Sequence, residues 1–381
     1  MTHAEDLARL RSLTGVKWTY YADDVIPAWV ADMDLPPAPV CVDAVRALLD
    51  RGDLGYSFAA ASRIPEVFAE RQTRLYGWSP DAERTRLFCD VVQAVEVALW
   101  AHTEPGDGVV LLTPVYHPFY GAIDATRCRL IDVPLGGPTW PLDVERLEAA
   151  IDATTRVLLL CNPHNPTGRS FGADELSALA DVAERHDLLV ISDEIWADLT
   201  YPPARHIPFA SISPAAASRA VTVTAASKAF NLAGLCCAVG NLGHDGVSNT
   251  IAALPHHLFG AVSSPGAEAT LAAWTLGDQW LETTRAHLQA NRDHLAARLA
   301  RELPEVGLTT PEATYLAWLD FTALGLGDDP AGALLDTARV ALSGGLQFGA
   351  AGAGFARLNF ATTRTLLDEI IDRLVAAIGA A

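Results

Sequence analysis

The stretch "RVLLLCNPHNPTGRSFGADELSALADVAERHDLLVISDE" (Arg156–Glu194) contains the clearest indication of the fold class. It opens with the apolar run Arg156–Leu160 and closes with a second one, Leu188–Ser192. Between them, Ala173–His186 has leucine and valine on one face and charged residues on the other, which is the pattern of an amphipathic helix. Fully apolar strands separated by amphipathic helices are typical of a parallel sheet that is covered by helices on both faces.

The same alternation continues through the middle of the chain. Further strands are predicted at Arg86–Val92, Gly108–Thr113, Arg129–Val133, Ala220–Thr224 and Cys236–Asn241. We therefore expect an α/β fold whose large domain, residues 51–277, holds a mostly parallel seven-stranded sheet.

The pattern changes from about Asp278. A long helix is predicted at Asp278–Glu302 and a final one at about Thr363–Ile378, with strands within Thr314–Phe321 and Phe355–Phe360. Residues 278–381 are therefore expected to form a smaller α+β domain. The first fifty residues, rich in Trp, Pro and Asp, are expected to pack with it rather than fold alone.

Composition narrows the classes of function. The formal net charge of the 381 residues is −19, which argues against a nucleic-acid partner because phosphate binding needs a basic surface. No apolar stretch approaches the roughly 20 residues of a membrane span, and no signal peptide is visible, so a cytoplasmic protein is expected. Six cysteines without CxxC spacing predict reduced thiols. The histidines form no HExxH pattern, and His256 and His257 are interpreted as loop residues, so no metal site is expected.

Lysine is rare in this chain. Of the 27 lysines and arginines, only Lys17 and Lys228 are lysines. Lys228 lies in "SKAFNLAGLCCAVG" (Ser227–Gly240), between an apolar run and a glycine-containing apolar segment. What lysine alone offers in such a place is a primary amine that burial makes less basic and that can form a Schiff base.

Polar side chains follow four of the predicted strands, where ligands of open α/β sheets bind. They are Tyr116, Asn165, Asp193 and Lys228. Taken singly, Asn165 could be a turn residue, Asp193 a helix N-cap and Tyr116 ordinary core. Together they suit a pyridine cofactor, which needs an amine, an anion at its ring nitrogen, a donor for its ring oxygen and an aromatic neighbour. The strand-to-helix turn "CDVVQAV" (Cys89–Val95) can bind the phosphate through free N–H groups.

Eight stretches spread over nearly the whole chain carry a known family pattern: "KWTYYADDVIPAWVADMD" (Lys17–Asp34), "LGYSF" (Leu54–Phe58), "TPVYHPFY" (Thr113–Tyr120), "CNPHNPTGRSF" (Cys161–Phe171), "SDEIWADL" (Ser192–Leu199), "SKAFNLAGL" (Ser227–Leu235), "TYLAWLDF" (Thr314–Phe321) and "GFARLNFATTR" (Gly354–Arg364). In these stretches the chain resembles the fold-type I pyridoxal-phosphate (PLP) enzymes of aminotransferase class I/II. Within them it is most similar to the MalY/PatB-type cystathionine β-lyases, also called cysteine-S-conjugate β-lyases.

The resemblance implies roles for the residues already singled out. Lys228 would form the Schiff base with PLP and act as the general base at Cα of the substrate. Asp193 would pair with the pyridinium nitrogen, Asn165 would bond the ring oxygen and Tyr116 would stack on the ring.

It also implies residues that the strand pattern alone does not single out. Val91 and Val92 would donate backbone N–H groups to the phosphate, assisted by the Ser227 hydroxyl. Tyr56 would reach the phosphate in the neighbouring subunit, so a homodimer is expected. Arg357 would bind the substrate α-carboxylate.

The chain departs from the aminotransferase pattern at two positions. Three residues after Asp193, where tyrosine is common, stands Trp196, which can stack on the cofactor or donate its indole N–H but is no acid. Eight residues after Lys228, where an arginine commonly binds the phosphate, stands Cys236. The segment Ser343–Gly354, which lies where the family shapes its substrate pocket, is short and rich in small residues.

The function implied is a PLP-dependent carbon–sulfur lyase that cleaves an L-cysteine S-conjugate by α,β-elimination to a thiol, pyruvate and ammonia. The same residues would also serve an aminotransferase. A third outcome is a decarboxylating or oxidatively deaminating variant acting on an S-cysteine conjugate in natural-product biosynthesis. A scaffold that binds a regulatory partner is the alternative from a different class, and no basic patch or DNA-binding motif supports it.

Overall fold

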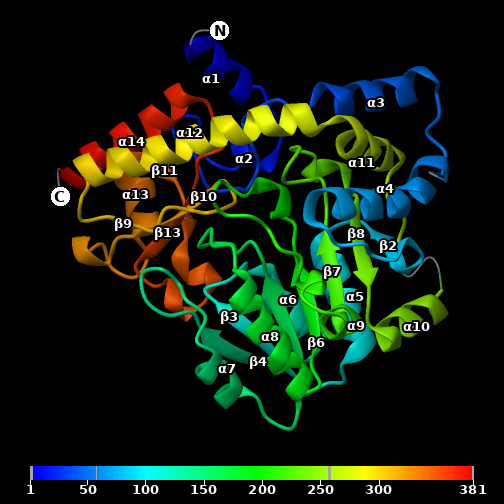
Figure 1. Cartoon of the computed structure of the whole chain (residues 1–381). Helices are drawn as coiled ribbons and strands as arrows, with labels where there is room; N and C mark the ends of the chain where they lie inside the picture. The colour runs from blue at the N-terminus through cyan, green and yellow to red at the C-terminus, as the bar shows by residue number, and fades with distance from the viewer. Residues whose placement is uncertain (1–2, 57, 256–258, 380–381) are drawn as a thin grey trace.

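The main sheet decides where the functional site lies. The computed structural model of the chain describes residues 3–56, 58–255 and 259–379 (Figure 1). Seven strands form this sheet in the order β2-β8-β7-β6-β5-β3-β4. Their bounds are β2 Thr85–Phe88, β3 Gly108–Thr113, β4 Arg129–Pro134, β5 Thr155–Cys161, β6 Leu189–Asp193, β7 Ala220–Thr224 and β8 Ala238–Leu242. Only β8 runs antiparallel to its neighbours, so the predicted mostly parallel seven-stranded sheet is confirmed.

Two of the predicted strands are too long at one end. β2 stops at Phe88 because Asp90 caps helix α5 (Val91–His102), accepting a hydrogen bond from the backbone N–H of Gln93 at 2.8 Å. β8 starts only at Ala238 because Cys236 has a left-handed backbone, with φ of 52°, which no regular strand contains. The other five predicted strands agree with the structure to within one residue at each end.

Both faces of the sheet are buried, which explains the continuous apolar runs. In β3, Val109 and Leu111 pack with α5 on one face, whereas Val110 and Leu112 belong to the core on the other. The first core also includes residues of α6 (Pro118–Ala125) and α10 (Asp245–Ala253). The second includes residues of α4 Ala59–Tyr76, α7 Val144–Ala150, α8 Ala173–Arg185, α9 Pro214–Ser218 and α11 Ser264–Leu276.

The remainder of the chain builds a smaller α+β unit, as expected. Its antiparallel sheet has the order β12-β13-β10-β9. The bounds are β9 Gly307–Leu308, β10 Leu316–Asp320, β12 Ser343–Gly344 and β13 Phe355–Asn359, with helices α12 Asp278–Glu302, α13 Pro330–Ala338 and α14 Arg364–Gly379. Helix α12 has the predicted bounds and packs along α14 (Figure 1).

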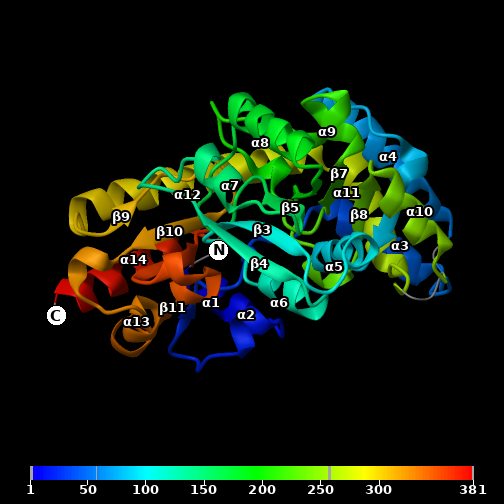
Figure 2. The ribbon, with the colours of Figure 1, turned by 90° about the horizontal axis from the view of Figure 1, so that it is seen from below.

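The first fifty residues contact both parts of the chain. They contain α1 His3–Arg11, α2 Val16–Thr19, β1 Ile26–Pro27 and α3 Pro39–Asp50. Strand β1 pairs in parallel with β11 (Val340–Ala341) of the smaller unit, whereas α3 packs against α11 of the larger one. α1 contacts α14 of the smaller unit, and Figure 2 shows α3 far from it beside α11. The segment between β1 and α3 therefore crosses from one unit to the other, and it passes the carboxyl ends of the main strands.

Two further expectations from the sequence concern membrane spans and the neighbouring histidines. None of the helices in the described ranges is long and apolar enough to cross a membrane. His256 and His257, interpreted above as loop residues, lie outside the described residues.

Candidate active site

A cavity of about 410 Å³ lies where the main sheet, the smaller unit and the N-terminal segment meet. Most of the residues predicted to form the site line it: Val91, Val92, Tyr116, Asn165, Asp193, Trp196, Ser227, Lys228 and Arg357. It also takes Trp29, Val30 and Ala31 from the N-terminal segment, and Ser343 and Gln347 from the segment expected to shape the substrate pocket. The fold thus brings together residues at the ends of five strands of the main sheet and residues of the smaller unit.

The start of α5 forms one wall of the cavity. Val91 and Val92 are the first two residues of this helix, and both line the cavity. The first N–H groups of a helix have no acceptor within the helix, and they carry its positive dipole end. Asp90 caps the third position, and Ser227 lines the same cavity. This wall is suited to an anion such as a phosphate group.

Asp193 is a buried carboxyl at the last position of β6. Its side chain accepts one hydrogen bond from the N–H of Ile195 at 3.0 Å, and the residue is 3% exposed. Burial raises the pKa of Asp193 to about 7; the N–H of Ile195 and the charge of Lys228 oppose this rise, and the charge of Glu194 adds to it. A carboxyl that is this deeply buried beside a cavity is stabilised in its ionised form by a cationic ligand.

The neighbouring Glu194 is also buried, and donors surround it. Its carboxylate accepts hydrogen bonds from the hydroxyl of Ser192 and the N–H of Phe209, both at 2.9 Å, and lies 2.9 Å from Nε2 of His206. His206, which the sequence analysis missed, therefore holds the second carboxylate at the end of β6. His206 reaches the end of β6 only in the folded chain, so no local sequence pattern indicated its role.

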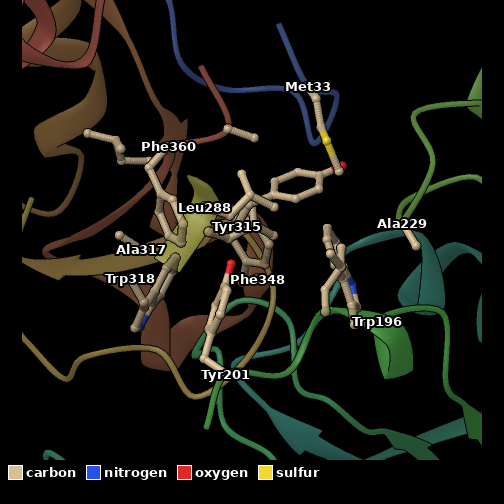
Figure 3. Packing of buried hydrophobic residues seen from close by; sticks show 14 of the residues in the cluster. Met33, Trp196, Tyr201, Ala229, Leu288, Tyr315, Ala317, Trp318, Phe348 and Phe360 are labelled. Atoms are coloured by element: carbon tan, nitrogen blue, oxygen red, sulfur yellow. The ribbon is translucent and has the colours of Figure 1, made fainter. Parts of the chain in front are cut away.

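Two aromatic side chains line the cavity from different strands' ends. The ring of Tyr116 packs edge-to-face on Phe119, with centroids 5.6 Å apart. Trp196 is 2% exposed, and its ring meets Tyr315 edge-to-face at 4.8 Å (Figure 3). Tyr315 in turn donates its hydroxyl to the carbonyl oxygen of Ala31 at 2.7 Å. Trp196 is therefore a fixed wall of the site.

Arg357, on β13, is buried, and its guanidinium donates three hydrogen bonds to uncharged oxygen atoms. One nitrogen of its guanidinium donates to Oδ1 of Asn165 at 2.9 Å, and the other to Ser343 Oγ at 3.1 Å and to the carbonyl of Trp29 at 3.0 Å. Within the described ranges no carboxylate lies at ion-pair distance from it, and its buried Nε has no partner. Burial lowers the pKa of Arg357 to about 10. A buried guanidinium in this state is suited to bind the carboxylate of a ligand.

Lys228 places its amine at the same cavity. Nζ donates to the carbonyl oxygen of Ala31 at 2.9 Å and lies 3.9 Å from Oδ1 of Asp32. Burial lowers the pKa of the amine, while the Asp32 carboxylate opposes this effect. The amine of Lys228 is therefore more readily neutral, and more nucleophilic, than that of an exposed lysine.

The segment Trp29–Leu35 is held by side chains from distant parts of the chain. Asn231, three residues after Lys228, exchanges hydrogen bonds with both the N–H and the carbonyl of Met33. Asn359 donates to the carbonyls of Val30 and Asp32, at 2.6 and 2.7 Å. The sequence analysis missed both asparagines. The signal that could have indicated Asn231 was its position in the same short motif as Lys228.

Lys17 is a further residue whose place the sequence did not indicate. It is buried, and its amine lies 2.9 Å from Oδ1 of Asp34 and donates to the carbonyl of Asp32 at 3.0 Å. The rarity of lysine was the signal, since both lysines of the chain bind the same segment, Ala31–Asp34.

Tyr56 alone among the predicted site residues lies away from the cavity. Its side chain is fully exposed on the surface of the larger unit. A single chain holds no second subunit, so the role predicted for Tyr56 at a partner's cofactor stays a prediction. Cys236 is exposed as well and does not line the cavity, whereas Cys237 and Cys89 do.

The α/β fold and the cavity are those of an enzyme. Comparison with known proteins shows the family to which the chain belongs. The model of the family "Aminotransferase class I and II" matches residues 55–374, and the chain belongs to this family. It is 35% identical to cystathionine beta-lyase PatB of Bacillus subtilis, over 95% of this chain and 96% of that protein. It is 32% identical to protein MalY of Escherichia coli, over 96% of this chain and 95% of that protein.

Comparison with solved structures supports the same family. The PLP-bound C-S lyase from Staphylococcus hominis superposes with a TM-score of 0.91 at 29% identity, over 97% of this chain and 96% of that one. The predicted resemblance to MalY/PatB-type enzymes, and the fold that it implied, are confirmed.

Proposed function

We propose that the chain is a PLP-dependent carbon–sulfur lyase that cleaves L-cysteine S-conjugates of the cystathionine type into a thiol, pyruvate and ammonia. One observation carries the proposal. The amine of Lys228 lines the same cavity as the buried carboxyl of Asp193 and the buried guanidinium of Arg357, which has no anionic partner within the described residues. The similarity to a cystathionine beta-lyase and to a PLP-bound C-S lyase supports it.

The residues present fit PLP. The Lys228 amine can attach to the aldehyde carbon of PLP, Asp193 can pair with the ring nitrogen, and the start of α5 can hold the phosphate. Because Oδ1 of Asn165 already accepts from Arg357, its amide nitrogen is available to donate to the ring oxygen. When bound, PLP supplies an electron sink that acidifies the Cα–H bond of an amino acid.

The side chains of the cavity then determine which bond breaks. Arg357 binds the α-carboxylate and so fixes the amino acid, with its Cα proton directed at the amine of Lys228. Lys228 removes that proton, and Asp193 keeps the ring nitrogen protonated while charge develops. If Cβ carries a thiolate leaving group, the electron pair from Cα expels it, and hydrolysis gives pyruvate and ammonia.

We also propose that the active form is a homodimer. Tyr56 and its neighbours Leu54 and Phe58 are 100%, 65% and 82% exposed, an apolar group that a second copy of the chain would cover. In this arrangement Tyr56 would serve the cofactor phosphate of the partner. The six free cysteines of this acidic chain support a reducing, cytoplasmic location.

Product analysis tests the proposed reaction. Purified protein loaded with PLP is incubated with a panel of S-substituted L-cysteines, and thiol, pyruvate, keto acid and carbon dioxide are measured. Thiol with an equal amount of pyruvate supports the lyase. A keto acid that retains the sulfur would identify an aminotransferase instead, and carbon dioxide would identify loss of the carboxylate.

A second experiment tests the cofactor site itself. Borohydride reduction of the loaded protein should attach the cofactor to the peptide that contains Lys228, and Lys17 is the internal control because it is the only other lysine. A Lys228→Ala variant should lose the attachment and the turnover together. Attachment at Lys17 would contradict the proposal.

A further inference from the structure

Two oxygen atoms of the N-terminal segment lie close to the amine of Lys228. The carbonyl oxygen of Ala31 accepts a hydrogen bond from Nζ at 2.9 Å, and Oδ1 of Asp32 lies 3.9 Å away. Ala31 lines the cavity, and its carbonyl also accepts the hydroxyl of Tyr315 at 2.7 Å. Asp32 keeps 38% of its side chain exposed and does not belong to the cavity wall. In this structure, therefore, the amine is held against the N-terminal segment.

Buried groups fix the main chain of this segment, so the carbonyl of Ala31 and the backbone that carries the Asp32 carboxylate hold their positions. The main-chain carbonyl of Asp32 accepts from Asn359 at 2.7 Å and from Lys17 at 3.0 Å. Lys17 is itself anchored by Asp34, and the side chains of this pair are 5% and 2% exposed. Asn231, from the same loop as Lys228, holds the next residue of the segment. A position fixed from three sides costs little further ordering when the lysine amine returns to it.

The chemistry of a neutral amine gives this position a purpose. Such an amine has two N–H donors and one lone pair. When its N–H groups are directed at Ala31 and Asp32, its lone pair is directed away from the segment. Lys228 would need this state in the proposed reaction, because only a neutral amine can take the Cα proton.

We propose that the carbonyl of Ala31 and the carboxylate of Asp32 form the docking site for the released amine of Lys228, and that Asp32 is a positioning residue that directs its lone pair at Cα. This inference rests on the proposed function, because it assigns a step of that reaction. It adds a residue outside the cavity wall to the machinery of the reaction.

The charges around Lys228 allow a direct test. Burial and the guanidinium of Arg357 lower the pKa of the amine, whereas the carboxylates of Asp32 and Asp193 raise it, with Asp32 the larger of the two. Tyr315 is a further titratable neighbour through its bond to Ala31, and Tyr116 and His117 line the same cavity. Removing the charge of Asp32 while keeping its size should therefore make the amine of Lys228 less basic.

The first measurement uses protein without cofactor. Trace labelling with acetic anhydride across a pH series reports the neutral fraction of each amine, and because the chain has only two lysines, peptide mapping separates Lys228 from Lys17. Labelling after denaturation gives the reference. In Asp32→Asn the labelling midpoint of Lys228 should move to lower pH, and in Asp32→Glu it should stay near that of the wild type. An unmoved midpoint in Asp32→Asn overturns the proposal.

Asp23→Asn is the matched control, because it removes an exposed carboxylate from the chain just before β1, at a residue that does not line the cavity. Its labelling midpoint should equal that of the wild type. Thermal melts of all three variants establish that each is folded. If Asp32→Asn does not fold, the comparison of Asp32→Glu with the wild type decides: a midpoint that falls although the charge is retained overturns the proposal.

The second measurement uses the loaded enzyme. Because the base must be neutral, the acidic limb of kcat follows the pKa of the Lys228 amine. In Asp32→Asn that limb should move to lower pH while maximal kcat falls about 10- to 100-fold, since the base is weaker and less well aimed. A loss of kcat without movement of the limb would mean a structural role and would overturn the proposal. Failure of the proposed function is separate: it would appear as cofactor attached elsewhere than Lys228, whereas the labelling shift needs no cofactor.

Discussion

Replacement of Arg357 by methionine separates binding of substrate from stability of the fold. The guanidinium is 4% exposed, donates three hydrogen bonds and has no anionic partner among the described residues. Because burial lowers its pKa from 12.5 to about 10, keeping it charged costs about 3 kcal/mol of folding free energy. Hydrogen bonds from a charged donor return about 1.5 kcal/mol each or slightly more. The two effects nearly cancel, so Arg357→Met should change the unfolding free energy by less than about 2 kcal/mol.

The effect on catalysis should be much larger. Truncating one partner of a buried charged pair typically costs about 2–5 kcal/mol, and this pair exists only when the substrate carboxylate is bound. At about 1.4 kcal/mol for each tenfold change, kcat/KM should fall about 30- to 4,000-fold. Arg357→Lys, which keeps the charge but not the planar two-nitrogen geometry, should fall between the variant and the wild type.

The assay compares two substrates on each protein. One is an S-substituted L-cysteine and the other is the same compound without its carboxylate, the matching cysteamine conjugate. The wild type should strongly prefer the first, and Arg357→Met should have lost most of that preference, while urea denaturation of the unliganded proteins gives the stability change. Equal losses on both substrates, or a loss of stability above about 4 kcal/mol, would mean that Arg357 is a structural residue and does not bind the substrate carboxylate.

Four further predictions concern other parts of the molecule. Lys228→Ala should abolish turnover while PLP still binds without a covalent bond, measured by equilibrium dialysis. Asp193→Asn should stabilise the unliganded protein relative to the wild type, and the difference should grow as pH rises from about 4 to 8. The reason is that the pKa of Asp193 in the folded protein, about 7, lies above the ordinary 3.8, so ionisation of the wild-type carboxyl costs folding free energy over that range. A difference in urea denaturation that does not change with pH would contradict this. Lys17→Met should lower the unfolding free energy by about 3–5 kcal/mol by leaving the Asp34 carboxylate buried and unpaired, and the double variant Lys17→Met/Asp34→Leu should recover much of it. Tyr56→Ala should weaken PLP binding in a protein that sediments as a dimer, and a fully active monomer would reject the shared site.

The sequence determined the sheet and most of the cavity because both depend on local patterns. A strand that is buried on both faces is a continuous apolar run whatever else surrounds it, and helix α12 was predicted with its observed bounds. Asp193 ends a strand, and Asn165 and Lys228 come four residues after strands. Because parallel strands end at one edge of a sheet, their meeting could be inferred without coordinates. Arg357 came only from family resemblance, since nothing near it in the chain marks a ligand for carboxylate.

Only the tertiary structure decided how the lysine is held. Lys228 and Ala31 are 197 residues apart, and Asn359 and Asp32 are 327 apart, so no local pattern links them. The bonds they form are to main-chain carbonyls, which every residue possesses, and such an acceptor leaves no mark in the sequence. The same holds for His206 against Glu194: a buried carboxylate requires a donor, but the sequence does not say which distant side chain the fold will bring to it.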